Sequence, residues 1–286
     1  MAVSADSLLP HRWPGEPLPG VLVERPNRFL ARCIVGAQTI SAHVPDRGRC
    51  LDLLVPGQEV IVVAAPARDP ARAGPARMGA SRVGESRSGE SRVGEARIGA
   101  PPLGPTRAGR ERTTAFTLLL ARAKTAPSPW VSIDPAGASR LVAAAIDGGL
   151  LDVPLGGARV QAREVSVDHG GERSRIDLLL TDGTLCEVKS VGAARGGVAL
   201  FPDAPTLRGV RHLALLAARA RRGLPAAVVF CAQREDALAV APDFETDPGF
   251  ARALDRAASA GVRLLAIACS AEPRGMRLLG IVPVLR

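Results

Sequence analysis

The stretch GERSRIDLLLTDGTLCEVKS, residues 171–190, constrains the fold more than any other part of the sequence. In it, Asp177 ends a polar run and opens an apolar one, and a turn over 181–183 leads into a segment where charged and neutral residues alternate. Successive side chains of a strand point to opposite faces of the sheet. The pattern therefore predicts a hairpin with Glu187 and Lys189 on one face and Asp177 beside them.

Two carboxylates and an ammonium gathered on one sheet face are costly for folding alone. Carboxylate oxygens are the ligands that Mg²⁺ prefers, and a lysine can orient or activate the attacking water in phosphodiester chemistry. We therefore expect Asp177 and Glu187 to be metal ligands, with Lys189 catalytic beside them. The alternative is an exposed ion-pair cluster on a hairpin.

Three charged side chains flank this hairpin. Glu164, on the preceding predicted strand, is either a third carboxylate of the metal site or a solvent-facing residue. Arg173 and Arg175 share the face of Asp177 by strand alternation. They can hold a phosphate backbone bidentately, neutralise the carboxylates, or do both.

The pattern upstream of residue 136 differs from the pattern downstream. Five or so short strand-like segments between residues 20 and 135 predict a small barrel, a kind of fold that often binds oligonucleotides. From residue 136 to 286 the expected order is α-β-β-β-α-β-α-β, which predicts a mixed α/β domain with helices packed on the sheet. Residues 1–19 are expected to form a disordered tail.

Residues 66–112 interrupt the predicted barrel with a five-residue repeat close to V-G-E-S-R. A period of five fits neither a helix nor a strand, so we expect a disordered loop, either a tolerated insertion or a nonspecific phosphate contact. It contains ten arginines and five acidic residues, and this excess of five positive charges is over half of the net charge of +9. A pI near 10.6 favours a polyanionic partner such as nucleic acid, but this loop weakens the argument for a basic folded face.

Five scattered cysteines without a C-x-x-C pair predict buried free thiols in a reducing compartment and make a structural zinc site improbable. The N-terminus lacks a signal-peptide pattern, and no apolar run approaches the ~20 residues of a membrane span. The expected location is the cytoplasm, without a membrane partner.

Four words of the sequence carry a resemblance to a known family: GERSRID (171–177), CEVKS (186–190), FPDAPTLRGVRHL (201–213) and VVF (228–230). Together they resemble the SfsA family, the sugar fermentation stimulation proteins, over roughly residues 20–65 and 113–286. The resemblance implies an N-terminal OB-like barrel followed by a PD-(D/E)xK restriction-endonuclease-like domain, α/β in class and α+β overall. In the barrel, the family pattern H-x-P-N-T-G is altered to HVPDRG (43–48).

The resemblance also implies roles for the helix that Pro205 and Thr206 open, because this helix often lines the active site in the superfamily. Arg208 and His212 are four residues apart and share a helix face. Arg208 is then a phosphate contact and His212 a proton donor to the leaving oxygen. Asp203 is either a neighbour of the metal site or a turn or capping residue.

The predicted barrel offers further candidate nucleic-acid contacts, Arg28 first among them, with Arg25, Arg32 and His43 beside it. The resulting hypothesis is a DNA-binding protein with an Mg²⁺- or Mn²⁺-dependent nuclease site. Its rival is a noncatalytic DNA-binding regulator of sugar (maltose) metabolism that keeps the nuclease fold. An enzyme acting on a phosphorylated metabolite ranks last, because the sequence lacks a GxxxxGK[ST] loop.

Overall fold

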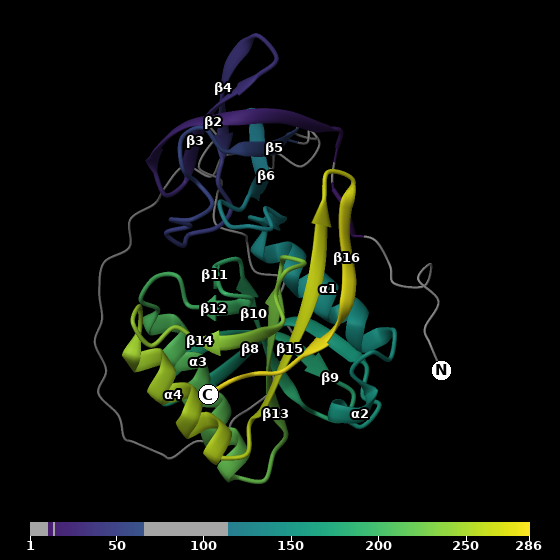
Figure 1. Ribbon diagram of the computed structural model, residues 1–286. Coiled ribbons are helices and arrows are strands. Elements are labelled where there is room, and N and C mark those ends of the chain that lie inside the picture. The colour runs from purple at the N-terminus through teal and green to yellow at the C-terminus, as the bar shows by residue number, and fades with distance from the viewer. Residues whose placement is uncertain (1–10, 14, 66–113) are drawn as a thin grey trace, which may run out of the picture.

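The computed structural model describes residues 11–13, 15–65 and 114–286 (Figure 1). The repeat segment over 66–112 lies outside these residues. None of the helices in the described ranges is long and apolar enough to cross a membrane.

The N-terminal part is a small β-barrel, as the sequence predicts. Its strands are β2 (Pro17–Asn27), β3 (Leu30–Val35), β4 (Gln38–His43), β5 (Glu59–Ala64), β6 (Phe116–Arg122) and β7 (Trp130–Ser132). The order β4-β3-β2-β5-β6 closes into a ring through a further β4–β6 pairing, and β7 extends β6. Alternate side chains such as Ala31 and Cys33 point inward and are fully buried.

The second part is a mixed α/β domain built on a seven-stranded sheet ordered β1-β16-β15-β13-β10-β9-β8. Its elements after the barrel are α1 (Pro135–Asp147), α2 (Asp152–Leu155), β8 (Val160–His169), β9 (Glu172–Leu180), β10 (Leu185–Val191), β11 (Ala194–Arg195), β12 (Val198–Phe201), α3 (Leu207–Arg221), β13 (Ala226–Ala232), β14 (Ala239–Pro242), α4 (Pro248–Ser259), β15 (Arg263–Glu272) and β16 (Gly275–Val282). Strands β10, β13 and β15 are parallel and central. Strand β13 is apolar throughout because both of its faces are covered.

Helices cover both faces of this sheet (Figure 1). Leu141 and Ile146 of α1 pack against Cys186 and Val188 on one face, and this core continues into the barrel through Leu119. On the other face α3 and α4 pack together over the alternate residues of β10 and β13. The face under α3 is therefore the one that Glu187 and Lys189 share.

The structure departs from the predicted tail. His11–Arg12 form β1, which pairs with Met276 and Gly275 of β16. Trp13 is buried and its Nε1 donates to the carbonyl of Glu272 at 2.9 Å. Strand β2 begins at Pro17, so the expectation of disorder over 1–19 is wrong for residues 11–13 and 15–19.

The predicted element order is also incomplete. It lacks α2, β16 and the small sheet β11-β12-β14. In α3, Leu207 is 82% exposed at the first turn of the helix, whereas His212 is buried.

Candidate active site

The acidic pair is positioned by the end of a β-ladder. Strands β9 and β10 pair in antiparallel register through Leu179–Leu185 and Leu178–Cys186, and the pairing stops there. At the next position the carboxylate of Asp177 replaces a backbone acceptor: its Oδ2 accepts the N–H of Val188 at 2.7 Å. Asp177 is thus fixed beside Glu187 by the same hairpin that the sequence predicts.

Glu187 lies at the centre of the cluster. Its Oε1 accepts a hydrogen bond from Lys189 Nζ at 2.7 Å and lies 2.5 Å from Nδ1 of His212. A carboxylate can only accept, so Nδ1 of His212 carries the proton. The three residues are between 3% and 8% exposed, which makes this a buried charged network rather than an exposed ion-pair cluster.

The two carboxylates have different proton affinities. Burial and the neighbouring charge of Glu187 raise the pKa of Asp177 to about 6. Burial also acts to raise the pKa of Glu187, but Lys189 and His212 outweigh it and hold this pKa below its usual value. Carboxylates whose pKa values are driven apart by their surroundings are a frequent mark of functional sites.

The donor set fits a divalent cation. Oε2 of Glu187 is buried and has no hydrogen-bond partner among the described residues. An unpartnered buried carboxylate oxygen is costly unless something occupies it. Together with the Asp177 carboxylate, it supplies the hard oxygen ligands that Mg²⁺ or Mn²⁺ requires.

Helix α3 brings His212 and Arg208 to the site. Thr206 caps the helix by accepting the N–H of Gly209 at 3.0 Å, and Asp247 in turn accepts the N–H of Thr206 at 2.8 Å. A Cβ at Gly209 would lie 2.8 Å from Thr206 and 3.1 Å from Phe250. This glycine therefore lets α3 sit close against α4, which sets the depth at which His212 meets Glu187.

Beside His212 lies a basic cavity of about 260 Å³, which we call the arginine hollow. It is lined by Glu172, Arg173, Ser174, Arg175, Arg208, Arg211 and His212. Arg211 pairs with Glu172 at 3.5 Å and Arg175 with Glu164 at 3.5 Å. Arg173 and Arg208 have no carboxylate partner in the part of the chain that the structure describes. The structure thus gathers all three predicted arginines of this domain, and adds Arg211.

Two predicted site residues stand apart from this cluster. Glu164 is on β8, with a side chain 68% exposed that pairs with Arg175 rather than with the acidic pair. Its role as a third metal ligand stays a prediction. Arg28 is exposed near the β2–β3 turn, and nothing joins it to the acidic pair. Arg25 has a structural role, since it donates to the carbonyls of Gly48 and Arg28.

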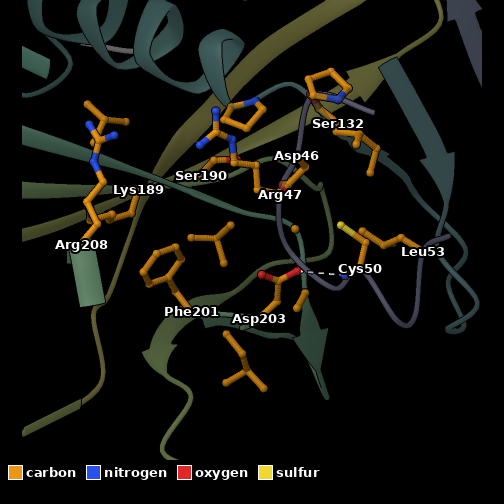
Figure 2. A pocket seen from close by; sticks show the side chains of 18 residues that line it. Asp46, Arg47, Cys50, Leu53, Ser132, Lys189, Ser190, Phe201, Asp203 and Arg208 are labelled. Carbon is orange, nitrogen blue, oxygen red and sulfur yellow. Dashed lines mark hydrogen bonds between the residues drawn. The ribbon is translucent and has the colours of Figure 1, made fainter. Parts of the chain in front are cut away.

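Sequence reasoning missed a second cavity, the junction pocket, of about 390 Å³ between the barrel and the α/β domain (Figure 2). Asp46 and Cys50 from the barrel and Asp203 from the loop after β12 line it, and their potential ligand atoms lie within 4.8 Å of one another. Burial raises the pKa of Asp46 to about 6. The only sequence signal was the pair of aspartates in HVPDRG and FPDAP, words that are about 150 residues apart.

The barrel, the mixed sheet and the acidic hairpin define a protein with an OB barrel and a restriction-endonuclease-like domain. Residues 23–86 match the SfsA N-terminal OB domain, and residues 136–275 match the sugar fermentation stimulation protein RE domain. The chain belongs to the sugar fermentation stimulation protein (SfsA) family.

Curated relatives extend along nearly the whole chain. A sugar fermentation stimulation protein homolog of Moorella thermoacetica is 36% identical over 95% of this chain and 97% of its own length. A homolog of Chloroflexus aurantiacus is 38% identical over 94% of this chain and 86% of its own length. The solved structure of Pyrococcus furiosus SfsA in complex with Ca²⁺ has the same fold, with a TM-score of 0.71 at 22% identity, over 97% of this chain and all of that one.

Proposed function

We propose that the protein binds nucleic acid, DNA in the first instance, and hydrolyses phosphodiester bonds with a divalent cation held by Asp177 and Glu187. The single observation that carries the proposal is the buried, unpartnered Oε2 of Glu187 beside a carboxylate whose pKa is raised. When bound, Mg²⁺ or Mn²⁺ polarises the phosphate and lowers the pKa of the attacking water.

The side chains of this chain divide the remaining work. Lys189, held on Oε1 of Glu187, orients the attacking water and stabilises the charge that develops on the phosphate. The arginine hollow supplies charge-assisted hydrogen bonds to the phosphates of the bound strand. These contacts fix the strand but carry no base preference.

The family resemblance implies that His212 is a proton donor to the leaving oxygen. Its Nδ1 is engaged by Glu187, while its ring also lines the arginine hollow. A donor role therefore falls to Nε2, and it requires that Nε2 carry a proton in addition to the one on Nδ1. In that role the proton lost from His212 protonates the departing alkoxide when the P–O bond breaks.

The test is a panel of labelled single- and double-stranded DNA and RNA incubated with Mg²⁺ or Mn²⁺. Wild-type protein should cleave at least one substrate, and Glu187→Gln and Lys189→Ala should each lower the rate by at least about a hundredfold. Glu245→Gln, at an exposed glutamate that pairs with Arg195 and lines neither cavity, is the matched control and should retain most of the activity. Cleavage that persists in Glu187→Gln contradicts the site.

Salt-dependent binding without turnover, unaffected by Lys189→Ala, would instead support the noncatalytic regulator. Substrate strandedness and the choice of DNA over RNA are read directly from the panel.

A further inference from the structure

The junction pocket has no part in the chemistry proposed above, yet it opens onto the same side chains. Its volume of about 390 Å³ is within the range of small-ligand sites. Lys189 lines it, and Arg208 lines both this pocket and the arginine hollow. A strand with its phosphates in the arginine hollow and its scissile phosphate at Lys189 would therefore have its next nucleoside at this pocket.

The walls of the junction pocket suit a flat, apolar face. Figure 2 shows Phe201 between the end that holds Lys189 and Arg208 and the end that holds Leu53. The Phe201 ring is held in place by Phe250, with ring centroids 5.0 Å apart. Aromatic rings in basic grooves are the surfaces on which single-stranded nucleic acids stack their bases.

The polar end of the pocket offers acceptors. Asp46 Oδ1 accepts the N–H of Gly48 at 2.7 Å, and Asp203 Oδ2 accepts the N–H of Cys50 at 3.0 Å. A Cβ at Gly48 would lie 2.2 Å from both oxygens of Asp203, so this glycine admits the carboxylate. The remaining acceptor capacity of ionised carboxylates can be met only by donors.

Nucleobases differ in the hydrogen-bond donors that they can offer to such carboxylates. Cytosine, adenine and guanine each carry an exocyclic amino donor, whereas thymine and uracil place a carbonyl oxygen there. Two carboxylates at the end of a pocket accept from an amino group. Thymine and uracil offer them only an N3–H that is flanked by two carbonyl oxygens, which the carboxylates repel.

We propose that the junction pocket binds one unpaired nucleobase next to the scissile phosphate and favours bases with an exocyclic amino group over thymine and uracil. The inference rests on the proposed function, and it names the substrate class as single-stranded or frayed nucleic acid, because a paired base cannot enter such a pocket without leaving the stack. Asp203 and Asp46 are specificity residues in this assignment, and the barrel becomes part of the substrate site.

A cation is the competing occupant, because Asp46, Cys50 and Asp203 approach one another closely. The Cys50 thiol is protonated in the absence of a cation, since burial raises its pKa well above the usual range, and a cation would have to displace that proton. The other two potential cation ligands, Asp46 and Asp203, each already accept a backbone N–H. The pocket also has apolar walls, which a bound base would contact and a cation would not need.

The test measures equilibrium binding of dCMP, dAMP, dGMP and TMP at pH 8, which requires no cleavage. Wild-type protein should bind each of the first three at least about fivefold more tightly than TMP. Asp203→Asn keeps an acceptor for the Cys50 N–H but removes the charge, and it should reduce the preference to less than twofold. Asp52→Asn, an exposed aspartate in the same barrel segment, is the matched control and should leave the preference intact.

Equal binding of all four nucleotides by the wild type overturns the proposal, as does an unchanged preference in Asp203→Asn. Titration with Mn²⁺ alone covers the other occupant: loss of a bound Mn²⁺ in Asp203→Asn with no change in nucleotide preference assigns the pocket to a cation. Glu187→Gln separates the two claims, because it should abolish cleavage while keeping the base preference. A wild type that shows the preference but never cleaves refutes the proposed function alone.

Discussion

At the scale of single residues, the site depends on the different surroundings of Asp177 and Glu187, which shift their pKa values in opposite directions. Asp177 keeps one backbone hydrogen bond and has a pKa of about 6, while Lys189 and His212 hold the pKa of Glu187 below its usual value. Without a cation, the burial of two neighbouring carboxylates therefore lowers the stability of the folded protein. Such cost is expected where function, rather than stability, selects the residues.

Asp177→Asn should stabilise the metal-free protein at alkaline pH. The pKa of Asp177 is raised from 3.8 to about 6, so its stabilising neutral form is fully present below the lower value and is lost as pH rises through the higher. The variant should exceed the wild type at pH 8 by up to about 3 kcal/mol, a difference that fades by pH 4. Urea unfolding with a chelator measures it.

The control for this measurement is Asp52→Asn, whose exposed carboxylate should change stability by less than about 0.5 kcal/mol at either pH. Added Mn²⁺ should make the wild type more stable than Asp177→Asn at pH 8, because the ion binds the folded wild type and not the variant. A variant that is less stable than wild type at pH 8 contradicts the raised pKa.

Sequence alone anticipated the acidic hairpin because its geometry is local: alternation along one strand and one tight turn decide which side chains meet. The burial of His212 could not be predicted from the sequence. Its partner, Glu187, is 25 residues away, and a histidine close to Arg208 and Arg211 reads as part of a solvated face until tertiary packing is known.

At the scale of elements, helix α3 joins the cluster of Asp177, Glu187 and Lys189 to the arginine hollow. It presents Arg208 and Arg211 to the hollow and His212 to Glu187. Its position depends on the Thr206 cap and on close packing at Gly209. Small shifts of this helix should therefore affect both binding and catalysis.

Gly209→Ala tests that dependence. The added Cβ must displace Thr206 or Phe250, which should cost about 1–3 kcal/mol of stability and lower the cleavage rate under conditions where the variant is fully folded. Ala214→Ser, at an exposed position of the same helix, should change stability by less than about 0.5 kcal/mol. Thermal unfolding and single-turnover cleavage report the two effects. Wild-type stability in Gly209→Ala would show that α3 is free to adjust.

The arginine hollow is formed by β9 and α3 together, and it should act through phosphates. Arg173→Ala and Arg208→Ala should each weaken DNA binding to a similar extent for all sequences and reduce the slope of log K against log salt by about 1. Arg252→Ala, on the exposed side of α4, is the control and should leave the slope unchanged. Fluorescence anisotropy from 50 to 300 mM salt measures it. An unchanged slope in Arg173→Ala and Arg208→Ala would remove the hollow from the interface.

The long elements were predictable because their apolar periodicity is strong, whereas the short ones were not. Strands β11, β12 and β14 have two to four residues, too few to show alternation. The tail prediction failed for a similar reason. His11 and Arg12 form a strand only because they pair with the edge strand β16, which lies more than 260 residues further along the chain.

At the scale of the whole molecule, barrel and α/β domain are tied together. The barrel residues Ile61 and Leu119 belong to the same buried core as Leu141 of α1. Arg234, which is 1% exposed, donates to the carbonyl of Gly192 at 2.8 Å and contacts Thr125 beside the barrel at 3.4 Å. No local sequence pattern reveals such contacts, which is why the junction pocket escaped prediction.

The two halves should consequently unfold as one unit. The protein has two tryptophans: Trp13 packs on the α/β sheet, and Trp130 lies in the barrel beneath Arg122. Trp13→Phe and Trp130→Phe leave one reporter in each half. In each single-tryptophan protein, the fluorescence midpoint in urea should coincide with the circular-dichroism midpoint. A fluorescence midpoint that departs from the circular-dichroism midpoint of the same variant shows that the domains unfold independently.

The central claim, that Asp177 and Glu187 hold the catalytic cation, is tested most directly by locating Mn²⁺ through its anomalous scattering in crystals of the wild type. The account predicts a peak about 2.0–2.3 Å from an Asp177 oxygen and from Oε2 of Glu187, absent in Glu187→Gln. A peak confined to Asp46 and Asp203, or one that survives in Glu187→Gln, would contradict it.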